Sequence, residues 1–221
     1  MTRRVVVTGM GAVTPLGQGV AATWQGFVEG RSGVRRIQRF DPARVDSQIA
    51  GEIDTFDASG VLDRKDLRRF DRYIQLGLVA AREALDQAGL PGRLEGELAE
   101  RTGVILGSGL GGVSTLFDNV LLMAARGPDR ISPFFIPIGI ANVASGQVAI
   151  SFGPTGPNFA TVSACATGGH AIGEAWETIR RGDADVMIAG GVEAGIHEAV
   201  VGGFASMKAV STRNDDPQAA S

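Results

Sequence analysis

Short apolar runs that end near glycine alternate with longer segments of helical period, and this alternation constrains the fold more than any other feature of the sequence. The four runs occupy residues 5–7, 104–106, 159–162 and 186–189. Such runs are typical of strands that are buried on both faces of a parallel sheet. Strands that alternate with helices predict an α/β fold, with a mostly parallel mixed sheet covered by helices on both faces and functional residues at the carboxyl ends of the strands.

The longest helical pattern covers residues 70–88. Its apolar positions repeat at steps of three and four, at Phe70, Tyr73, Ile74, Gly77, Leu78, Ala81, Leu85 and Ala88. Gly89 and Pro91 end the pattern, because glycine favours helix termination and proline cannot continue a helix. The sequence therefore predicts a single amphipathic helix in this region.

Composition excludes several classes of protein. The chain has 221 residues, and 44% of them are hydrophobic, which is enough for a large buried core. A formal net charge of −3 gives no general attraction to nucleic acid or to a membrane surface. No apolar run approaches the about 18 residues that a membrane span needs, and residues 5–7 are too few for a signal peptide. The single cysteine excludes an intrachain disulfide and suits a reducing compartment, so we expect a cytoplasmic protein.

Cys165 is the candidate nucleophile. The predicted strand at 159–162 leads through Ala164-Cys165-Ala166-Thr167-Gly168-Gly169 into a helix that carries Ile172, Ala175, Trp176 and Ile179 on one face. Free N–H groups and the dipole at a helix N-terminus favour a thiolate, and one N–H can face a developing oxyanion. The small neighbours leave room for a substrate. Outside this context, a lone cysteine would be read as a small buried apolar residue.

A partial dinucleotide-binding pattern lies near the N-terminus, at Gly9-Met10-Gly11-Ala12-Val13-Thr14. Thr14 stands where the third glycine of that fingerprint belongs, and Pro15 follows it. We therefore expect no nucleotide binding, and we interpret the glycines as shaping a strand-to-helix turn.

A basic cluster lies at the start of the predicted 70–88 helix and just before it. Lys65, Arg68 and Arg72 are spaced by three and four residues, so they share one helix face. Cations at the start of a helix oppose its dipole, so local helix stability does not explain them, and a partner with negative charge would. The competing interpretation is a solvated charged face that includes Asp63, Asp66 and Asp71.

Several of these segments together resemble one family. The Cys165 segment and residues 4–11, 107–112, 131–135, 183–191 and 211–214 are similar, in the same order, to segments of the elongating, type II β-ketoacyl-acyl carrier protein synthases. The resemblance implies a thiolase-like α/β fold built from two similar halves. Residues 1–221 would supply the N-terminal half, and the C-terminal half would be absent from this sequence.

The resemblance also implies a function and a set of site residues. Cys165 would carry the acyl chain in fatty-acid elongation, and decarboxylation of malonyl-acyl carrier protein would supply the two-carbon unit. Leu110 matches a position that lines the acyl pocket, with ordinary core packing as the alternative, and Lys65, Arg68 and Lys208 match docking positions for the acidic acyl carrier protein. The family works as a homodimer and requires no metal or organic cofactor, since the phosphopantetheine arm arrives on the substrate.

The histidines of the sequence do not replace the family's catalytic pair, which would lie beyond residue 221 together with a supporting lysine and an oxyanion donor. His170 lies five residues after Cys165, about 140° around the same helix, so a packing or surface role is expected. His197 has no recognisable relation to Cys165. The isolated chain is therefore expected to have little or no condensing activity and to expose apolar surface that the second half would cover.

Two other functions stay open. A ketosynthase of polyketide assembly would share the fold and the cysteine, although the Cys165 segment argues mildly against it. A non-catalytic partner subunit of a ketosynthase dimer would be expected to lack the nucleophile, so Cys165 argues against that reading, whereas the missing histidines favour it.

Overall fold

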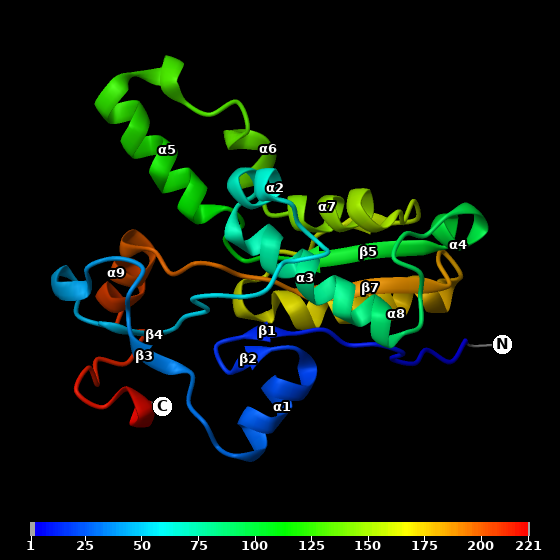
Figure 1. Cartoon of the computed structure of the whole chain (residues 1–221), viewed down its shortest axis with the longest axis horizontal. Coiled ribbons are helices and arrows are strands. Elements are labelled where there is room, and N and C mark those ends of the chain that lie inside the picture. The colour runs from blue at the N-terminus through cyan, green and yellow to red at the C-terminus, as the bar shows by residue number, and fades with distance from the viewer. Residues whose placement is uncertain (1–2, 221) are drawn as a thin grey trace. The chain divides into compact units, whose positions relative to one another are not determined.

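A computed structural model describes residues 3–220 and divides the chain into two units (Figure 1). Unit 1 contains residues up to Gly11 and the segment Ala58–Ala194, and unit 2 contains Ala12–Asp57 and the segment that begins at Gly195. Each unit has its own packing, and each is described separately.

Unit 1 contains a three-stranded parallel sheet. Its central strand, β5 (Thr102–Gly107), lies between β6 (Asn158–Phe159) and β7 (Val186–Gly191), and Val104 is paired with Asn158 on one side and Ile188 on the other. Every residue of β5 is buried, which explains why its sequence is continuously apolar rather than alternating. The predicted strands at 104–106 and 186–189 are confirmed, whereas β6 is shorter than the predicted run 159–162.

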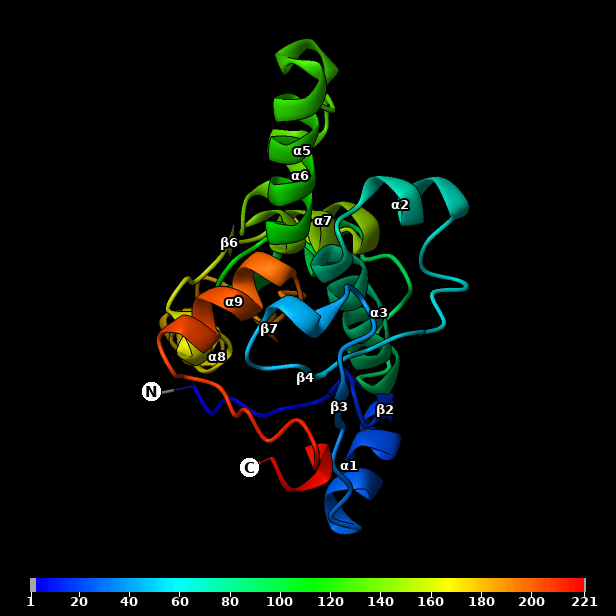
Figure 2. The same cartoon turned by 90° about the vertical axis from the view of Figure 1, so that its left-hand side faces the viewer.

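Helices cover both faces of this sheet. The helices α3 and α7 lie on one face, and α8 lies on the other, where Ile105 packs with Ala171 and Ala175 (Figure 2). The α/β fold with a helix-covered sheet is thereby confirmed. The helices of unit 1 are α2 (Arg64–Arg69), α3 (Arg72–Gln87), α4 (Gly96–Glu100), α5 (Val113–Arg126), α6 (Phe135–Gly139), α7 (Val143–Phe152) and α8 (Thr167–Arg181), with short 3₁₀ turns at Pro128–Arg130 and Ala164–Ala166.

The face of α8 that packs on the sheet is not the apolar face that the sequence predicts. Thr167, Ala171, Ala175 and Thr178 are the buried positions of α8. Ile172 and Trp176 are exposed, and the guanidinium of Arg180 lies 4.5 Å from the centre of the Trp176 ring. Alanines and threonines bring the helix closer to the strands than isoleucine and tryptophan would, so side-chain size outweighs hydrophobicity here.

The predicted strand at residues 5–7 is wrong. Residues 3–11 form no strand, and the side chains of Val6 and Val7 are 60% and 78% exposed. The two glycines that follow explain where the backbone goes: a Cβ on Gly9 would lie 2.1 Å from the carbonyl oxygen of Ala84, and one on Gly11 would lie 1.8 Å from that of Ala80. Glycine lets the segment lie directly on α3, so these residues serve packing, in place of the predicted strand-to-helix turn.

The pattern over residues 70–88 also contains a break. The helix α3 has the predicted buried face, which includes Tyr73, Ile74, Leu78 and Leu85, but Phe70 lies outside it, at the end of the separate helix α2. Asp71 causes the break because its carboxylate caps α3 by accepting from the N–H of Tyr73 at 3.2 Å.

The carboxylate of Asp71 also begins a second helix. Its other oxygen accepts from the backbone N–H of Thr115 at 3.1 Å and from the Thr115 hydroxyl at 2.7 Å, in the first turn of α5. The Asp71 side chain is buried, with 6% of its surface exposed. One buried carboxylate thus holds the starts of both α3 and α5.

Apolar side chains are exposed on α5. Leu116, Val120, Leu121 and Met123 are between 40% and 64% exposed. The exposure of apolar surface that the sequence predicts is therefore present in unit 1, while its coverage by a second half stays a prediction. None of the helices within residues 3–220 combines the length and apolar character that a bilayer crossing requires.

Unit 2 is built from short elements. These are the hairpin β1 (Val13–Thr14) and β2 (Gly17–Gln18), helix α1 (Val20–Val28), the antiparallel pair β3 (Val34–Arg36) and β4 (Ile49–Gly51), helix α9 (Glu198–Ser206) and 3₁₀ turns at Pro42–Arg44 and Pro217–Ala219. The carbonyl of Ser211 accepts from the buried Ser47 hydroxyl at 2.8 Å, which links the two chain segments of the unit.

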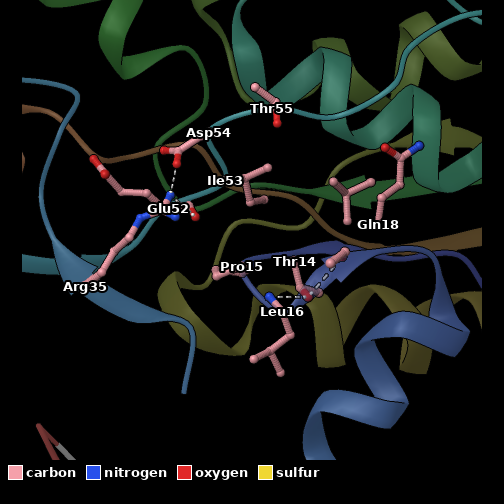
Figure 3. Close-up of a pocket in the computed structure, with 11 residues that line it drawn as sticks. Thr14, Pro15, Leu16, Gln18, Arg35, Glu52, Ile53, Asp54 and Thr55 are labelled. Carbon is pink, nitrogen blue, oxygen red and sulfur yellow. Dashed lines mark hydrogen bonds and ion pairs between the residues drawn. The ribbon is translucent and has the colours of Figure 1, made fainter. Parts of the chain in front are cut away.

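A small polar cavity of about 200 Å³ lies within unit 2 (Figure 3). Arg35 forms an ion pair of 2.5 Å with Asp54 and donates to the backbone carbonyl of Glu52 at 3.0 Å. The Glu52 side chain is only 2% exposed, and its carboxylate accepts from the N–H groups of Gln38 and Arg39 at 2.9 and 3.2 Å. The polar groups around the cavity therefore hold the chain segments of unit 2 together.

An ion-pair cluster at the start of the sheet predicts a pH dependence of stability. The carboxylate of Asp185 accepts from Arg101 at 3.0 Å and from Arg3 at 2.6 Å, and these bonds lower the pKa of Asp185 from 3.8 to about 2. Because the folded-state pKa is depressed, the stabilisation is complete above the ordinary value and is lost as the pH falls towards 2.

Thermal unfolding of the native chain and of an Asp185→Asn variant between pH 5 and pH 2 tests this dependence. The melting temperature of the native chain should exceed that of the variant at pH 5, and the two should converge near pH 2. A constant difference over this range would contradict the assignment.

Candidate active site

Cys165 lies in the 3₁₀ turn Ala164–Ala166, directly before the first residue of α8, and its side chain is exposed. The residue before it, Ala164, has a φ of +51°. A left-handed conformation at a residue other than glycine costs about 1–2 kcal/mol, and such strain is concentrated at functional sites. The turn therefore presents an accessible thiol at a helix N-terminus, where the positive end of the helix dipole favours a negative charge.

Close contacts fix this turn to the carboxyl ends of β5 and β7. A Cβ on Gly107, the last residue of β5, would lie 2.2 Å from the Cγ2 of Thr167 and 2.5 Å from the carbonyl oxygen of Thr161. A Cβ on Gly191, the last residue of β7, would lie 2.9 Å from the Cα of Gly168. Glycine at both strand ends lets the turn and α8 approach the sheet closely.

Three side-chain hydrogen bonds bracket Cys165. The Thr161 hydroxyl donates to the carbonyl of Thr167 at 3.0 Å, and the N–H of Ser163 donates to the Thr167 hydroxyl at 2.8 Å. The hydroxyl of Ser163 lies 2.6 Å from Nδ1 of His170. His170 is exposed and touches the residue two positions before the nucleophile, a contact that helical geometry alone did not predict.

Leu110 lies in the loop that follows β5. Its side chain is 44% exposed, so ordinary core packing does not describe it within the part of the chain that the structure shows. The same loop contacts the nucleophile turn, because a Cβ on Gly109 would lie 3.6 Å from the Cα of Ala164. The structure thus brings the Leu110 loop and the Cys165 turn together.

Glu193 was not singled out from the sequence. It follows β7 by two residues, and its carboxylate accepts from the Ser108 hydroxyl at 3.2 Å and from the N–H groups of Gly109 and Leu110 at 2.9 and 3.1 Å.

Burial raises the pKa of Tyr73, and the negative charges of Asp71 and Glu193 raise it further. Tyr73 therefore stays neutral and donates to the carbonyl of Ile140 at 2.7 Å.

Lys65 and Arg68 lie together at the rim of a cavity of about 500 Å³. The guanidinium of Arg69 lies 4.7 Å from the centre of the Phe70 ring and 5.4 Å from that of Phe134, distances that suit cation–π attraction. The other residues around the cavity are Asp71, Thr115, Asp118, Asn119, Ser132 and Ile138. The cavity thus combines exposed cations with an aromatic and aliphatic wall.

The expectation that this basic cluster opposes a helix dipole is wrong for Arg68, whereas Lys65 and Arg72 do lie at helix starts. Arg68 is in the last turn of α2, where a cation is favourable, but Lys65 is in the first turn of α2. Arg72 is the first residue of α3, so the three cations do not share one helix face as predicted. Asp63 caps the start of α2, and the N–H groups of Asp66 and Lys65 lower the pKa of this carboxyl. Local helix stability therefore accounts for Arg68 but not for Lys65 or Arg72, and the cavity gives a separate argument for a docking role.

The two remaining candidates belong to unit 2. Lys208 is exposed, follows α9 and has a φ of +56°. His197 caps α9, because its Nδ1 accepts from the N–H of Ala199 at 3.2 Å. Among the side chains of residues 3–220, no group of three or more His, Cys, Asp or Glu is arranged to hold a metal ion.

Comparisons with known proteins agree with this geometry. Residues 2–221 match the model of the family described as β-ketoacyl synthase, N-terminal domain. The 3-oxoacyl-[acyl-carrier-protein] synthase 2 proteins of Synechocystis sp. and Coxiella burnetii are each 46% identical to the chain over 220 and 219 residues. These alignments cover 99% of the chain and 52% of each relative, so the chain spans about half the length of the curated relatives it matches.

Solved structures show the same fold. A β-ketoacyl synthase from Burkholderia phymatum superimposes with a TM-score of 0.85 at 30% identity, covering 99% of the chain and 53% of that protein. A type II polyketide synthase acyl-carrier protein in complex with its ketosynthase gives a TM-score of 0.81 at 29% identity, covering 96% of the chain and 51% of the matched one. The chain belongs to the family of β-ketoacyl synthase N-terminal domains.

Proposed function

We propose that the protein is a condensing acyltransferase of fatty-acid elongation, with Cys165 as its nucleophile. The observation that carries this proposal is the exposed thiol in a strained turn at a helix N-terminus, fixed to the ends of two parallel strands. Acyl transfer needs a nucleophile with that access and with N–H donors beside it.

The proposed reaction has two bond exchanges. The Cys165 thiolate attacks the thioester of acyl-acyl carrier protein, and the phosphopantetheine sulfur leaves as a thiolate that takes up a proton from water. Malonyl-acyl carrier protein then loses CO2, and the resulting carbanion attacks the Cys165 thioester, which releases β-ketoacyl-acyl carrier protein and regenerates the thiolate. The thioester carbonyls hold the developing charge, so this scheme uses no metal or organic cofactor.

Two alternatives are weighed against this proposal. The curated relatives at 45–46% identity are named 3-oxoacyl-[acyl-carrier-protein] synthase 2, whereas the polyketide-type structural neighbour is 29% identical, which favours fatty-acid elongation. A non-catalytic partner subunit has no use for an exposed thiol in a strained turn.

Mass spectrometry of protein produced from the native gene tests the proposal. After incubation with acyl-acyl carrier protein, the peptide that contains Cys165 should gain the mass of the acyl group, and malonyl-acyl carrier protein should then yield a product two carbons longer. Absence of acylation would refute the proposal. Repeated extension without reduction would assign the protein to polyketide assembly instead.

The proposed partner is acyl carrier protein, which would bind at the cavity beside α2. Support comes from the exposed Lys65 and Arg68 at its rim and from Arg69, which is held over Phe70 and Phe134. Lys208 is proposed as a further docking cation, by its match to the family. We also propose that the protein forms a homodimer and is located in the cytoplasm. The cytoplasmic location is supported by the reaction, which needs a free thiol.

Charge reversal at the two rim cations should weaken the binding of acyl carrier protein. We expect Lys65→Glu with Arg68→Glu to raise KM for acyl-acyl carrier protein about five- to tenfold at low salt, because two attractive rim charges become repulsive. The rate of Cys165 alkylation by iodoacetamide should not change.

Arg126→Glu is the matched control, since this exposed arginine ends α5 and does not line the cavity. It should leave KM nearly unchanged. An equal increase in both variants would mean that total charge, rather than this cavity, attracts the carrier protein.

A further inference from the structure

The carboxylate of Glu193 shapes the loop between β5 and α5. One oxygen, Oε2, accepts from two consecutive backbone N–H groups, those of Gly109 and Leu110, and Oε1 accepts from the Ser108 hydroxyl. The Ser108 hydroxyl in turn accepts from the N–H of Gly111 at 2.9 Å, and the Ser108 side chain is buried. Four consecutive residues of the loop are thus connected to one side chain from the end of the neighbouring strand.

Side-chain packing does not hold Leu110 in the described residues, because this leucine is 44% exposed. Its position is set by its backbone, and its N–H is bonded to Glu193 at 3.1 Å. The loop also lies against the nucleophile turn, since a Cβ on Gly109 would lie 3.1 Å from Oε2 of Glu193 and 3.6 Å from the Cα and carbonyl oxygen of Ala164. The carboxylate therefore lies where the loop and the Cys165 turn meet.

Removal of this carboxylate leaves two neighbouring N–H groups without their acceptor. Consecutive N–H groups that point to one oxygen need an anion or a carbonyl to stay parallel, and charged acceptors bind them about twice as strongly as neutral ones. The Ser108 hydroxyl would also lose its acceptor but would keep its bond from Gly111, so the change would be confined to residues 108–110 rather than spread over the fold.

We propose that Glu193 is a positioning residue that fixes Leu110 beside Cys165 and thereby sets the preference for acyl chain length. The proposal rests on the proposed acyltransferase function. Glu193 does not contact the reacting atoms in this scheme, because it acts through the backbone of Gly109 and Leu110.

Amide hydrogen exchange tests the anchoring without any assay of activity. In Glu193→Ala, we expect the amides of Gly109 and Leu110 to exchange at least about tenfold faster than in the native chain, since two hydrogen bonds are lost. Glu193→Gln should give intermediate rates, because the amide oxygen still accepts. Glu174→Ala, which removes an exposed carboxylate from α8, is the matched control and should leave both rates unchanged.

The second measurement uses protein from the native gene and compares the rates of Cys165 acylation by short and long acyl-acyl carrier proteins. The ratio of these rates should change several-fold in Glu193→Ala, return towards the native ratio in Glu193→Gln and stay native in Glu174→Ala. Unchanged exchange at residues 109 and 110, or faster exchange with an unchanged ratio, would overturn the proposal. Native protein that takes up no acyl chain would instead refute the acyltransferase function, while the exchange result would still report on the anchoring.

Discussion

Replacing Cys165 by serine should reduce condensing activity by about a thousandfold or more in protein produced from the native gene, because removal of a covalent nucleophile eliminates the acyl intermediate. None of the three hydrogen bonds that bracket Cys165 involves its sulfur atom. The fold should therefore survive the change, and the serine hydroxyl would occupy the same place without the nucleophilicity of a thiolate.

Steady-state assays and intact-protein mass measurement check this expectation together. The variant should show neither product nor the acyl adduct, while its melting temperature should stay within a few degrees of the native value. Ser163→Ala is an informative comparison, because it loses the contact with His170 and keeps the thiol. Condensation by Cys165→Ser at a rate near the native one would mean that the acyl chain is carried elsewhere.

Gly107→Ala should have the largest effect on folding among the glycine substitutions around the nucleophile. Its Cβ would collide with the Cγ2 of Thr167 at 2.2 Å and with the carbonyl oxygen of Thr161 at 2.5 Å, and neither atom belongs to a long flexible side chain. Overpacking of this kind costs about 1–3 kcal/mol or more in the free energy of unfolding. The displaced turn should also change the rate at which Cys165 reacts with iodoacetamide.

Gly173→Ala is the control for this substitution. Gly173 lies on the exposed side of α8, and nothing comes within 4 Å of a Cβ built on it. Alanine in a helix interior is favoured over glycine by about 0.5–1 kcal/mol, so this variant should be more stable than the native chain. Urea unfolding measures both changes, and destabilisation of equal size would show that the close contact at Gly107 is not the cause.

The pattern of apolar residues was sufficient to predict elements that are buried throughout or along one regular face. The strand β5 is apolar throughout because it is buried throughout, and α3 shows its buried face as a three- and four-residue repeat. The break before α3 could have been predicted from two acidic residues. Asp63 and Asp71 each lie directly before a helix, and aspartate in that position is typical of a helix cap. Phe70 continued the apolar spacing by coincidence.

Features that depend on which strands become neighbours could not be predicted. Residues 5–7 have the composition of a strand, yet Gly9 and Gly11 place the segment against α3. The role of Glu193 depends on the register of β7 beside β5, which brings Gly191 opposite Gly107. Cys165 was predicted because its turn is local, whereas its hydrogen-bonded partners and the cavity at Lys65 and Arg68 arise only from tertiary packing.

The shared carboxylate of Asp71 has a mechanical consequence for α5. Swinging this helix away from α3 would strip the buried carboxylate of both Thr115 donors, a loss of about 3 kcal/mol for a charged acceptor. The helix that carries these apolar side chains is therefore anchored at its first turn to the start of α3. This anchor reduces the entropy that a partner of the apolar face would have to offset in ordering the start of the helix.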